Sequence, residues 1–142
     1  MSNPNNEELI FELALNLIPK IGPSLYRNIL AYTGSAKDFF DLPPGKISKI
    51  PRVNKKLSEI RKDKDQYIRE ASEIISNCQK KGIRILTFSD QNFPARVKVM
   101  DDCPMVLYTK GNINLNPNRS LAIVGTRNAT EYGKNITKKI IE

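Results

Sequence analysis

The chain of 142 residues contains no histidine and no tryptophan, and it has only two cysteines, Cys78 and Cys103. Without histidine, the usual general base of Ser–His and Cys–His hydrolases is missing, which argues against hydrolytic catalysis of those types. Two cysteines without histidine do not suffice for a typical zinc site. We therefore expect no metal, no cofactor and no hydrolase of either of these two types.

Long hydrophobic runs are also missing. No apolar run approaches the roughly 18 residues that a membrane-spanning helix needs. Residues 1–8, MSNPNNEE, lack the basic start and apolar core of a signal peptide. Because 39% of the residues are hydrophobic and 27% are charged, the composition suits a soluble globular protein. We expect a cytoplasmic protein without a membrane partner.

Positive charge, by contrast, is abundant, and the formal net charge is +8. Residues 46–62 hold seven Lys or Arg residues against one Glu. Such a run is typical either of a surface that faces nucleic-acid phosphates or of a solvated face on an ordinary basic protein. Under the first interpretation, Arg52, Lys55 and Lys56 are candidate DNA-binding residues.

Helical periodicity dominates the first part of the chain. Apolar residues recur at helical spacing over residues 7–18 and 65–81. Ser35 is a candidate cap for a short helix, and Gly82 suits the position just after the end of the longest helix. The pattern predicts an all-helical domain over residues 1–82.

After Gly82 the pattern changes to short apolar runs of β-forming residues, at 83–88, 104–109 and 121–124. Each is too apolar to lie alone at a surface, so we predict three strands that associate in one sheet. The order of elements predicts a second, α/β domain over residues 83–142. The fold class is therefore α followed by α/β.

Two segments in the helical part resemble the turn of a helix-hairpin-helix motif. The first covers residues 15–23, but Lys20 stands where the motif usually has its first glycine, and Pro23 has no amide to donate. The second covers residues 50–54 and lacks the glycine. Either the hairpins only pack, with basic side chains making any DNA contact, or they form a non-specific duplex-DNA module.

Residues 121–133, LAIVGTRNATEYG, predict a strand, a glycine turn and the start of a helix. This is the opening of a Rossmann-type unit, in which the helix N-terminus forms an anion site. Arg127 directly follows this turn, where its guanidinium either binds phosphate or pairs with a carboxylate. Because a parallel unit needs another strand after the helix, we expect the front portion of a longer protein.

Three motifs in order, residues 92–97 (NFPARV), 103–112 (CPMVLYTKGN) and 122–133 (AIVGTRNATEYG), together resemble the DNA-processing protein A family, DprA or Smf. The helical front part looks like that family's SAM-like domain, and the rest looks like the beginning of its extended Rossmann-like, parallel-sheet domain. The resemblance covers nearly all of this chain but only the first part of a typical member.

The resemblance implies a single-stranded DNA-binding protein without catalysis. Such proteins protect incoming DNA during natural transformation (competence) and load the RecA recombinase for DNA recombination, as homodimers in their full-length form. The implied DNA site includes Gly125, Thr126 and Arg127, with Lys110 as a neighbour. The enzymatic alternative is a Rossmann-like nucleotide-binding hydrolase that uses the Gly125 turn and Glu131.

Overall fold

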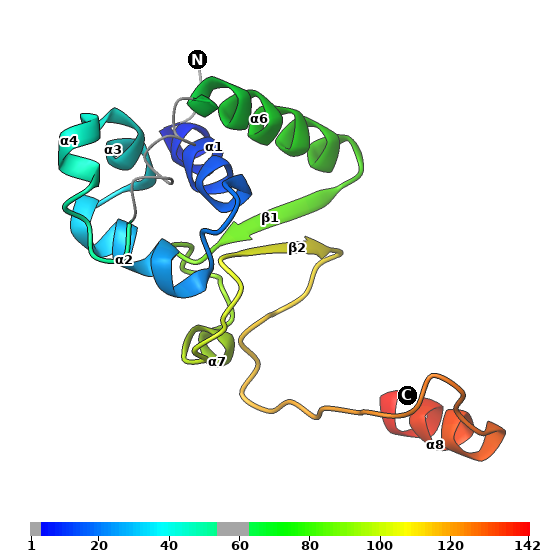
Figure 1. Ribbon diagram of the computed structural model, residues 1–142. Helices are drawn as coiled ribbons and strands as arrows, with labels where there is room; N and C mark the ends of the chain where they lie inside the picture. The colour runs from blue at the N-terminus through cyan, green and yellow to red at the C-terminus, as the bar shows by residue number, and fades with distance from the viewer. Residues whose placement is uncertain (1–3, 54–62) are drawn as a thin grey trace.

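The structure, a computed structural model, describes residues 4–53 and 63–142 (Figure 1). In chain order its elements are α1 (Pro4–Leu17), α2 (Pro23–Thr33), α3 (Ala36–Asp41), α4 (Pro44–Ile47), α6 (Lys64–Lys80), β1 (Ile83–Thr87), α7 (Ala95–Lys98), β2 (Val106–Lys110) and α8 (Glu131–Ile141). Among the described residues, none before Ile83 lies in a strand, which confirms the helical prediction for that part of the chain.

Helix α1 is the central element of the helical part. It lies between α3 and α6 and packs against both (Figure 1). Its residues Leu13, Ala14 and Leu15 are fully buried, because neighbouring elements cover more than one side of this helix. Burying a large aliphatic side chain contributes about 1.5–3 kcal/mol, so the apolar stripe seen in the sequence becomes the core.

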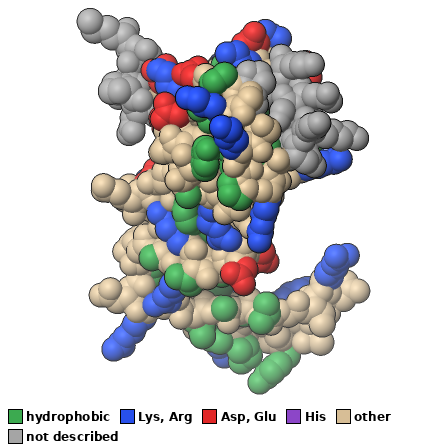
Figure 2. Space-filling model, turned by 60° about the vertical axis from the view of Figure 1, so that its left-hand side comes forward, with side chains coloured by type: hydrophobic (Ala, Val, Ile, Leu, Met, Phe, Trp, Pro, Cys, Tyr) green, Lys and Arg blue, Asp and Glu red, His purple; other side chains and the backbone are tan. Residues whose placement is uncertain are grey.

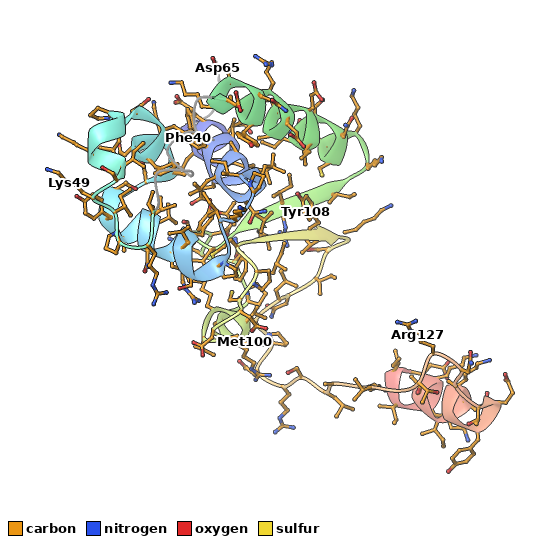
Figure 3. The ribbon with its side chains drawn as sticks, viewed as in Figure 1. Phe40, Lys49, Asp65, Met100, Tyr108 and Arg127 are labelled. Atoms are coloured by element: carbon orange, nitrogen blue, oxygen red, sulfur yellow. The ribbon has the colours of Figure 1, made fainter. Side chains whose placement is uncertain are left out.

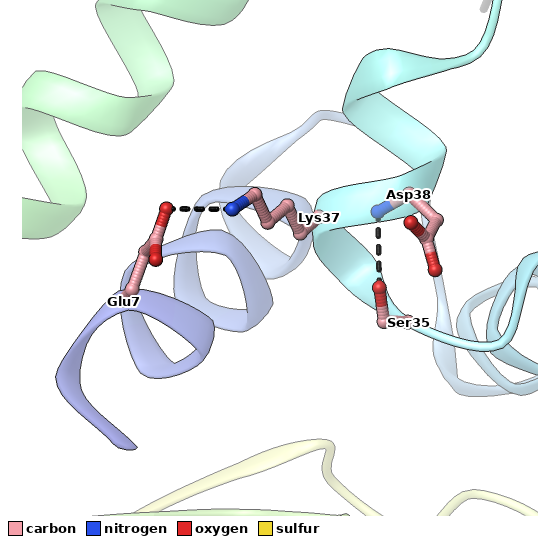
Figure 4. A network of polar contacts seen from close by, with 4 residues as sticks. All are labelled: Glu7, Ser35, Lys37 and Asp38. Carbon is pink, nitrogen blue, oxygen red and sulfur yellow. Dashed lines mark hydrogen bonds and ion pairs between the residues drawn. The ribbon is translucent and has the colours of Figure 1, made fainter. Parts of the chain in front are cut away.

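Polar contacts fix the start of α3 against α1 (Figure 4). Ser35 Oγ accepts a hydrogen bond of 3.0 Å from the backbone N–H of Asp38, as expected of a helix cap. Beside it, Lys37 Nζ lies 2.8 Å from Glu7 Oε1. Because both charged side chains are about half exposed, solvent screens this ion pair and it contributes little to stability. The cap therefore defines where the helix begins.

The sheet has two strands, β1 and β2, which pair antiparallel. Ile83 lies opposite Lys110 at one end of the ladder, and Thr87 lies opposite Val106 at the other. The structure thus confirms the first two predicted strands. The pair is antiparallel, whereas the predicted sheet was parallel, and no parallel pair is present within residues 4–53 and 63–142.

The predicted third strand, residues 121–124, is wrong for this structure. These residues lie outside any helix or strand, and Val124 is 95% exposed. A strand needs a neighbour to satisfy its backbone N–H and C=O groups. None of the described segments lies in ladder register with residues 121–124, so their apolar sequence does not produce a strand.

The hydrophobic core continues past Gly82. Leu86, Phe93, Cys103 and Met105 are buried in the same cluster as the side chains of the helices. Gly82 itself has φ +63, a left-handed conformation that favours glycine and turns the chain from α6 into β1. A domain boundary at Gly82 stays a prediction. In the described part of the chain, no helix combines the length and apolarity needed to cross a membrane.

Helix α8 lies away from the other elements, at the end of a long extended segment (Figure 1). Ile140 and Ile141 on this helix are 54% and 73% exposed. Figure 2 shows hydrophobic side chains gathered at the lower end of the molecule, the height at which Figure 1 places α8. The end of the described chain therefore carries apolar surface that the rest of it does not cover.

Candidate nucleic-acid interface

Arg127 lies in the exposed loop between the extended segment and α8, as the sequence predicts. Its side chain points away from α8 into open space (Figure 3). Gly125 and Thr126, directly before it, are exposed as well. Within the described ranges, no carboxylate forms an ion pair with Arg127. A free guanidinium offers five N–H donors in a planar fork that matches a phosphate.

The beginning of α8, three residues further on, is capped by Thr130. Its Oγ1 accepts a hydrogen bond of 3.2 Å from the N–H of Gly133, at the helix start that the sequence predicts here. In the same turn, Lys134 Nζ lies 2.7 Å from Glu131 Oε1. Both side chains are exposed, so this is a surface ion pair at the first turn of the helix.

The segment before this loop is held in place by two side chains, Asn116 and Arg96. Asn116 Oδ1 accepts a hydrogen bond of 2.7 Å from the N–H of Ala95, and its Nδ2 donates to the carbonyl of Phe93 at 3.4 Å. Arg96 donates to Ser120 Oγ and to a backbone carbonyl nearby. These contacts attach the chain that leads to Arg127 to the α7 turn.

Sequence reasoning did not assign this anchoring role to Asn116 or Arg96. Arg96 belongs to the motif NFPARV, but its partner Ser120 lies more than 20 residues away in the chain. Residues 112–118, which include four asparagines, lie outside any helix or strand. Only the folded arrangement shows what the two side chains contact.

Of the other predicted site residues that the structure describes, Lys110 and Arg52 do not gather around Arg127. Lys110 is exposed at the end of β2, near Tyr108, and Figure 3 shows Tyr108 and Arg127 well apart. Arg52 lies in the helical part, where its Nη1 donates a hydrogen bond of 2.8 Å to Ser24 Oγ. Lys55 and Lys56 lie outside the described residues. The structure therefore presents separate basic regions rather than one joined site.

An acidic cavity lies elsewhere, among α1, α6 and β1. It measures about 840 Å³ and is lined by residues of α1, α6 and β1 and by the turn after β1, including Glu8, Glu12 and Asp90. Burial raises the pKa of the Glu12 carboxyl, and the nearby carboxylates raise it further. Hydrogen bonds from Ser89 and Thr87 act in the opposite direction. Such a cavity repels phosphate, so it is no candidate for a nucleic-acid site.

By its geometry, the molecule is a basic α+β protein with an exposed arginine, Arg127, in a loop before a helix, and among the described residues no carboxylate pairs with this arginine. Within the described residues, no group of three or more His, Cys, Asp or Glu side chains is arranged to hold a metal ion. Residues 84–142 match the model of the family described as DNA recombination-mediator protein A.

A curated relative also matches. The DNA processing protein DprA of Bacillus subtilis (strain 168) is 26% identical over 124 residues, which is 87% of this chain and 42% of the relative. The chain thus spans about two fifths of the length of that relative. No solved structure matches. Both matches are to DNA-processing protein A, and they confirm the resemblance that the motifs indicated.

Proposed function

We propose that this protein binds single-stranded DNA without sequence preference, in the service of DNA recombination. The names of the matched family and of the Bacillus relative support a role in DNA processing and recombination. The observation that carries the step to DNA binding is Arg127, an exposed guanidinium without a carboxylate partner among the described residues. A cation of this kind is suited to a phosphate.

The complete protein, in this proposal, protects incoming single strands during natural transformation, loads the RecA recombinase onto them and acts as a cytoplasmic homodimer without catalytic chemistry. Residues 1–82 form its helical, SAM-like domain, and residues 83–142 begin its Rossmann-like DNA-binding domain. Gly125 and Thr126 would bring the backbone of the Arg127 loop near the phosphate. Lys110 would contribute to this site only if DNA, or another part of the protein, bridges the distance between the end of β2 and the Arg127 loop.

The test is Arg127→Ala, with Arg69→Ala as the matched control. Arg69 is an exposed arginine on α6, so its replacement removes the same charge from another part of the surface. We expect Arg127→Ala to weaken binding of a labelled single strand by about 1–3 kcal/mol, the value of a charge-assisted contact. Fluorescence anisotropy at fixed salt measures both variants. Equal affinities of Arg127→Ala and the parent chain would refute the assignment.

A further inference from the structure

Two hairpins in the helical part repeat the same local sequence. The first hairpin is Ile18-Pro19-Lys20-Ile21, and the second is Ile50-Pro51-Arg52-Val53, which follows 32 residues later. Each therefore has an aliphatic residue, a proline, a cation and a second aliphatic residue, in that order. The match extends to the residue three before each hairpin, which is also aliphatic, Leu15 or Ile47.

The two backbones repeat as well. In the first hairpin the N–H of Ile21 donates to the carbonyl of Ile18 at 3.2 Å, and in the second the N–H of Val53 donates to the carbonyl of Ile50 at 3.1 Å. All four of these aliphatic side chains are buried. Their burial leaves the remaining residues of each hairpin, mainly the cation, to face the solvent.

Both cations adopt a left-handed backbone conformation, with φ +72 at Lys20 and φ +68 at Arg52. They are the only non-glycine residues of the described chain with positive φ. This conformation costs about 1–2 kcal/mol for a residue with a Cβ, and glycine would avoid the cost. Backbone geometry alone thus favours glycine at both positions, and a cation occupies both.

The hairpins lie next to each other. The hydrogen bond from Arg52 Nη1 to Ser24 Oγ places Arg52, the cation of the second hairpin, at the first turn of α2. Ser24 lies four residues after Lys20, the cation of the first hairpin. Lys49 stands just before the second hairpin and points outward from the helical part (Figure 3). We call Lys20, Lys49 and Arg52 the hairpin cations.

No carboxylate offsets the hairpin cations. The sequence contains no Asp or Glu from residue 18 to 35, and none from 42 to 58. In the described part of the chain, none of the three cations forms an ion pair, whereas Lys37, Lys134 and Lys138 do. Figure 2 brings this side of the molecule forward and shows Lys and Arg side chains over it, with Asp and Glu side chains beside some of them. The surface is therefore positive and available to an anionic partner.

We propose that the two hairpins form a second nucleic-acid surface that binds the phosphates of duplex DNA. Single-strand sites combine cations with aromatic rings on which bases stack, but residues 18–24 and 46–53 contain no aromatic residue. A protein partner would need exposed apolar anchors, and the aliphatic residues of both hairpins are buried. Cations without rings or anchors suit the outer phosphates of a duplex, which are contacted independently of sequence.

This surface does not depend on the proposed function of Arg127. The test compares two triple variants of the full chain that remove the same charges, Lys20→Ala/Lys49→Ala/Arg52→Ala and Lys80→Ala/Lys81→Ala/Arg84→Ala. The second set is exposed and lies around the turn from α6 to β1. Alanine keeps a Cβ at the left-handed positions, so the backbone cost is unchanged. Binding of a labelled duplex and of a single strand is measured over a salt series.

We expect the hairpin variant to bind the duplex at least about tenfold more weakly at low salt, with the slope of log affinity against log salt reduced by about one for each lost contact. The control variant should lose much less. A charge-preserving exchange, Lys20→Arg/Arg52→Lys, should keep duplex binding and so separates loss of charge from loss of fold.

Three results would overturn the proposal. The parent chain could fail to bind duplex at low salt, the two triple variants could lose affinity equally, or the hairpin variant could lose single-strand and duplex binding to the same extent. The last result would assign the hairpins to a single-strand surface. Loss of single-strand binding in Arg127→Ala with normal duplex binding would leave this proposal intact, so the two proposals fail separately.

Discussion

Arg52 Nη1 donates a hydrogen bond of 2.8 Å to Ser24 Oγ, and this contact joins the second hairpin to the helix that follows the first. The two residues are 28 positions apart in the chain. The contact holds one guanidinium N–H, and Arg52 is exposed, with no other partner of its side chain among the described residues. One arginine thus both connects the hairpins and remains able to bind an anion.

Lys20→Gly tests the cost of the left-handed backbone. We expect a stability gain of about 0–1 kcal/mol, because glycine removes the cost of a Cβ at φ +72 but adds conformational entropy to the unfolded chain. Chemical denaturation measures the change. Gly34→Ala is the opposite control. Gly34 has φ +89, so a Cβ at this position should lower the stability by about 1 kcal/mol or more. A clear loss of stability in Lys20→Gly would show that the lysine itself supports the fold.

Asn116→Ala tests the anchor of the segment that leads to Arg127. Losing the hydrogen bonds of Asn116 to the backbone of residues 93 and 95 should cost about 1 kcal/mol locally. We expect faster amide exchange at Ala95, whose N–H donates to Asn116 Oδ1, with little change in α1 or α6. Asn118→Ala is the control, because only the backbone carbonyl of Asn118 takes part in this contact. Unchanged exchange in Asn116→Ala would show that Arg96 alone holds the segment.

Local signals in the sequence predicted local structure well. Ser35 caps α3 because its hydroxyl needs only the N–H three residues later, and Gly82 ends α6 because a left-handed turn favours glycine. The apolar period over residues 65–81 likewise predicts α6, since one helix face packs on α1. In each case the interaction lies within a few residues or on one helix face.

Long-range features were predicted poorly. Residues 121–124 have a strand sequence, but a strand also needs a pairing partner, which their own sequence does not provide. The left-handed backbone at Lys20 and Arg52 was not expected, because glycine is the usual residue at positive φ. The contact between Arg96 and residue 120 depends on a fold that brings distant segments together. The identity of the candidate residue Arg127 was predictable, but its separation from Lys110 was not.

Glu12→Gln tests the buried carboxyl in the acidic cavity. Burial raises the pKa of Glu12 in the folded state, so folding favours the protonated form. Its contribution to stability is full below the unfolded-state pKa and is lost as the pH rises through the folded-state pKa. We expect Glu12→Gln, which is neutral at every pH, to be more stable than the parent at pH 7, with a smaller difference at pH 4.

Urea denaturation at both pH values measures this difference. Glu73→Gln is the control, because Glu73 is exposed on α6 and its replacement changes the net charge equally. A difference that does not grow with pH, or that is the same in both variants, would contradict the prediction.

The exposed apolar residues at the end of the described chain lead to the last prediction. Leu121 and Val124 are 72% and 95% exposed, and Ile140 and Ile141 on α8 are also more than half exposed. Contiguous apolar surface of this kind favours association. We expect the chain to self-associate as its concentration rises, measured by light scattering. The double variant Val124→Ser/Ile140→Ser should raise the dissociation constant of self-association by about tenfold or more, because burying one large aliphatic side chain contributes about 1.5–3 kcal/mol.

Ile113→Ser is the matched control for that variant, because Ile113 is 54% exposed but lies nearer to β2. If the chain associates through residues 121–124 and α8, Ile113→Ser should associate as strongly as the parent chain. If the chain scatters as a monomer at every concentration, its exposed apolar residues do not form a contact surface. If Ile113→Ser weakens association as strongly as the double variant, the contact is a general consequence of exposed apolar area and does not involve α8 in particular.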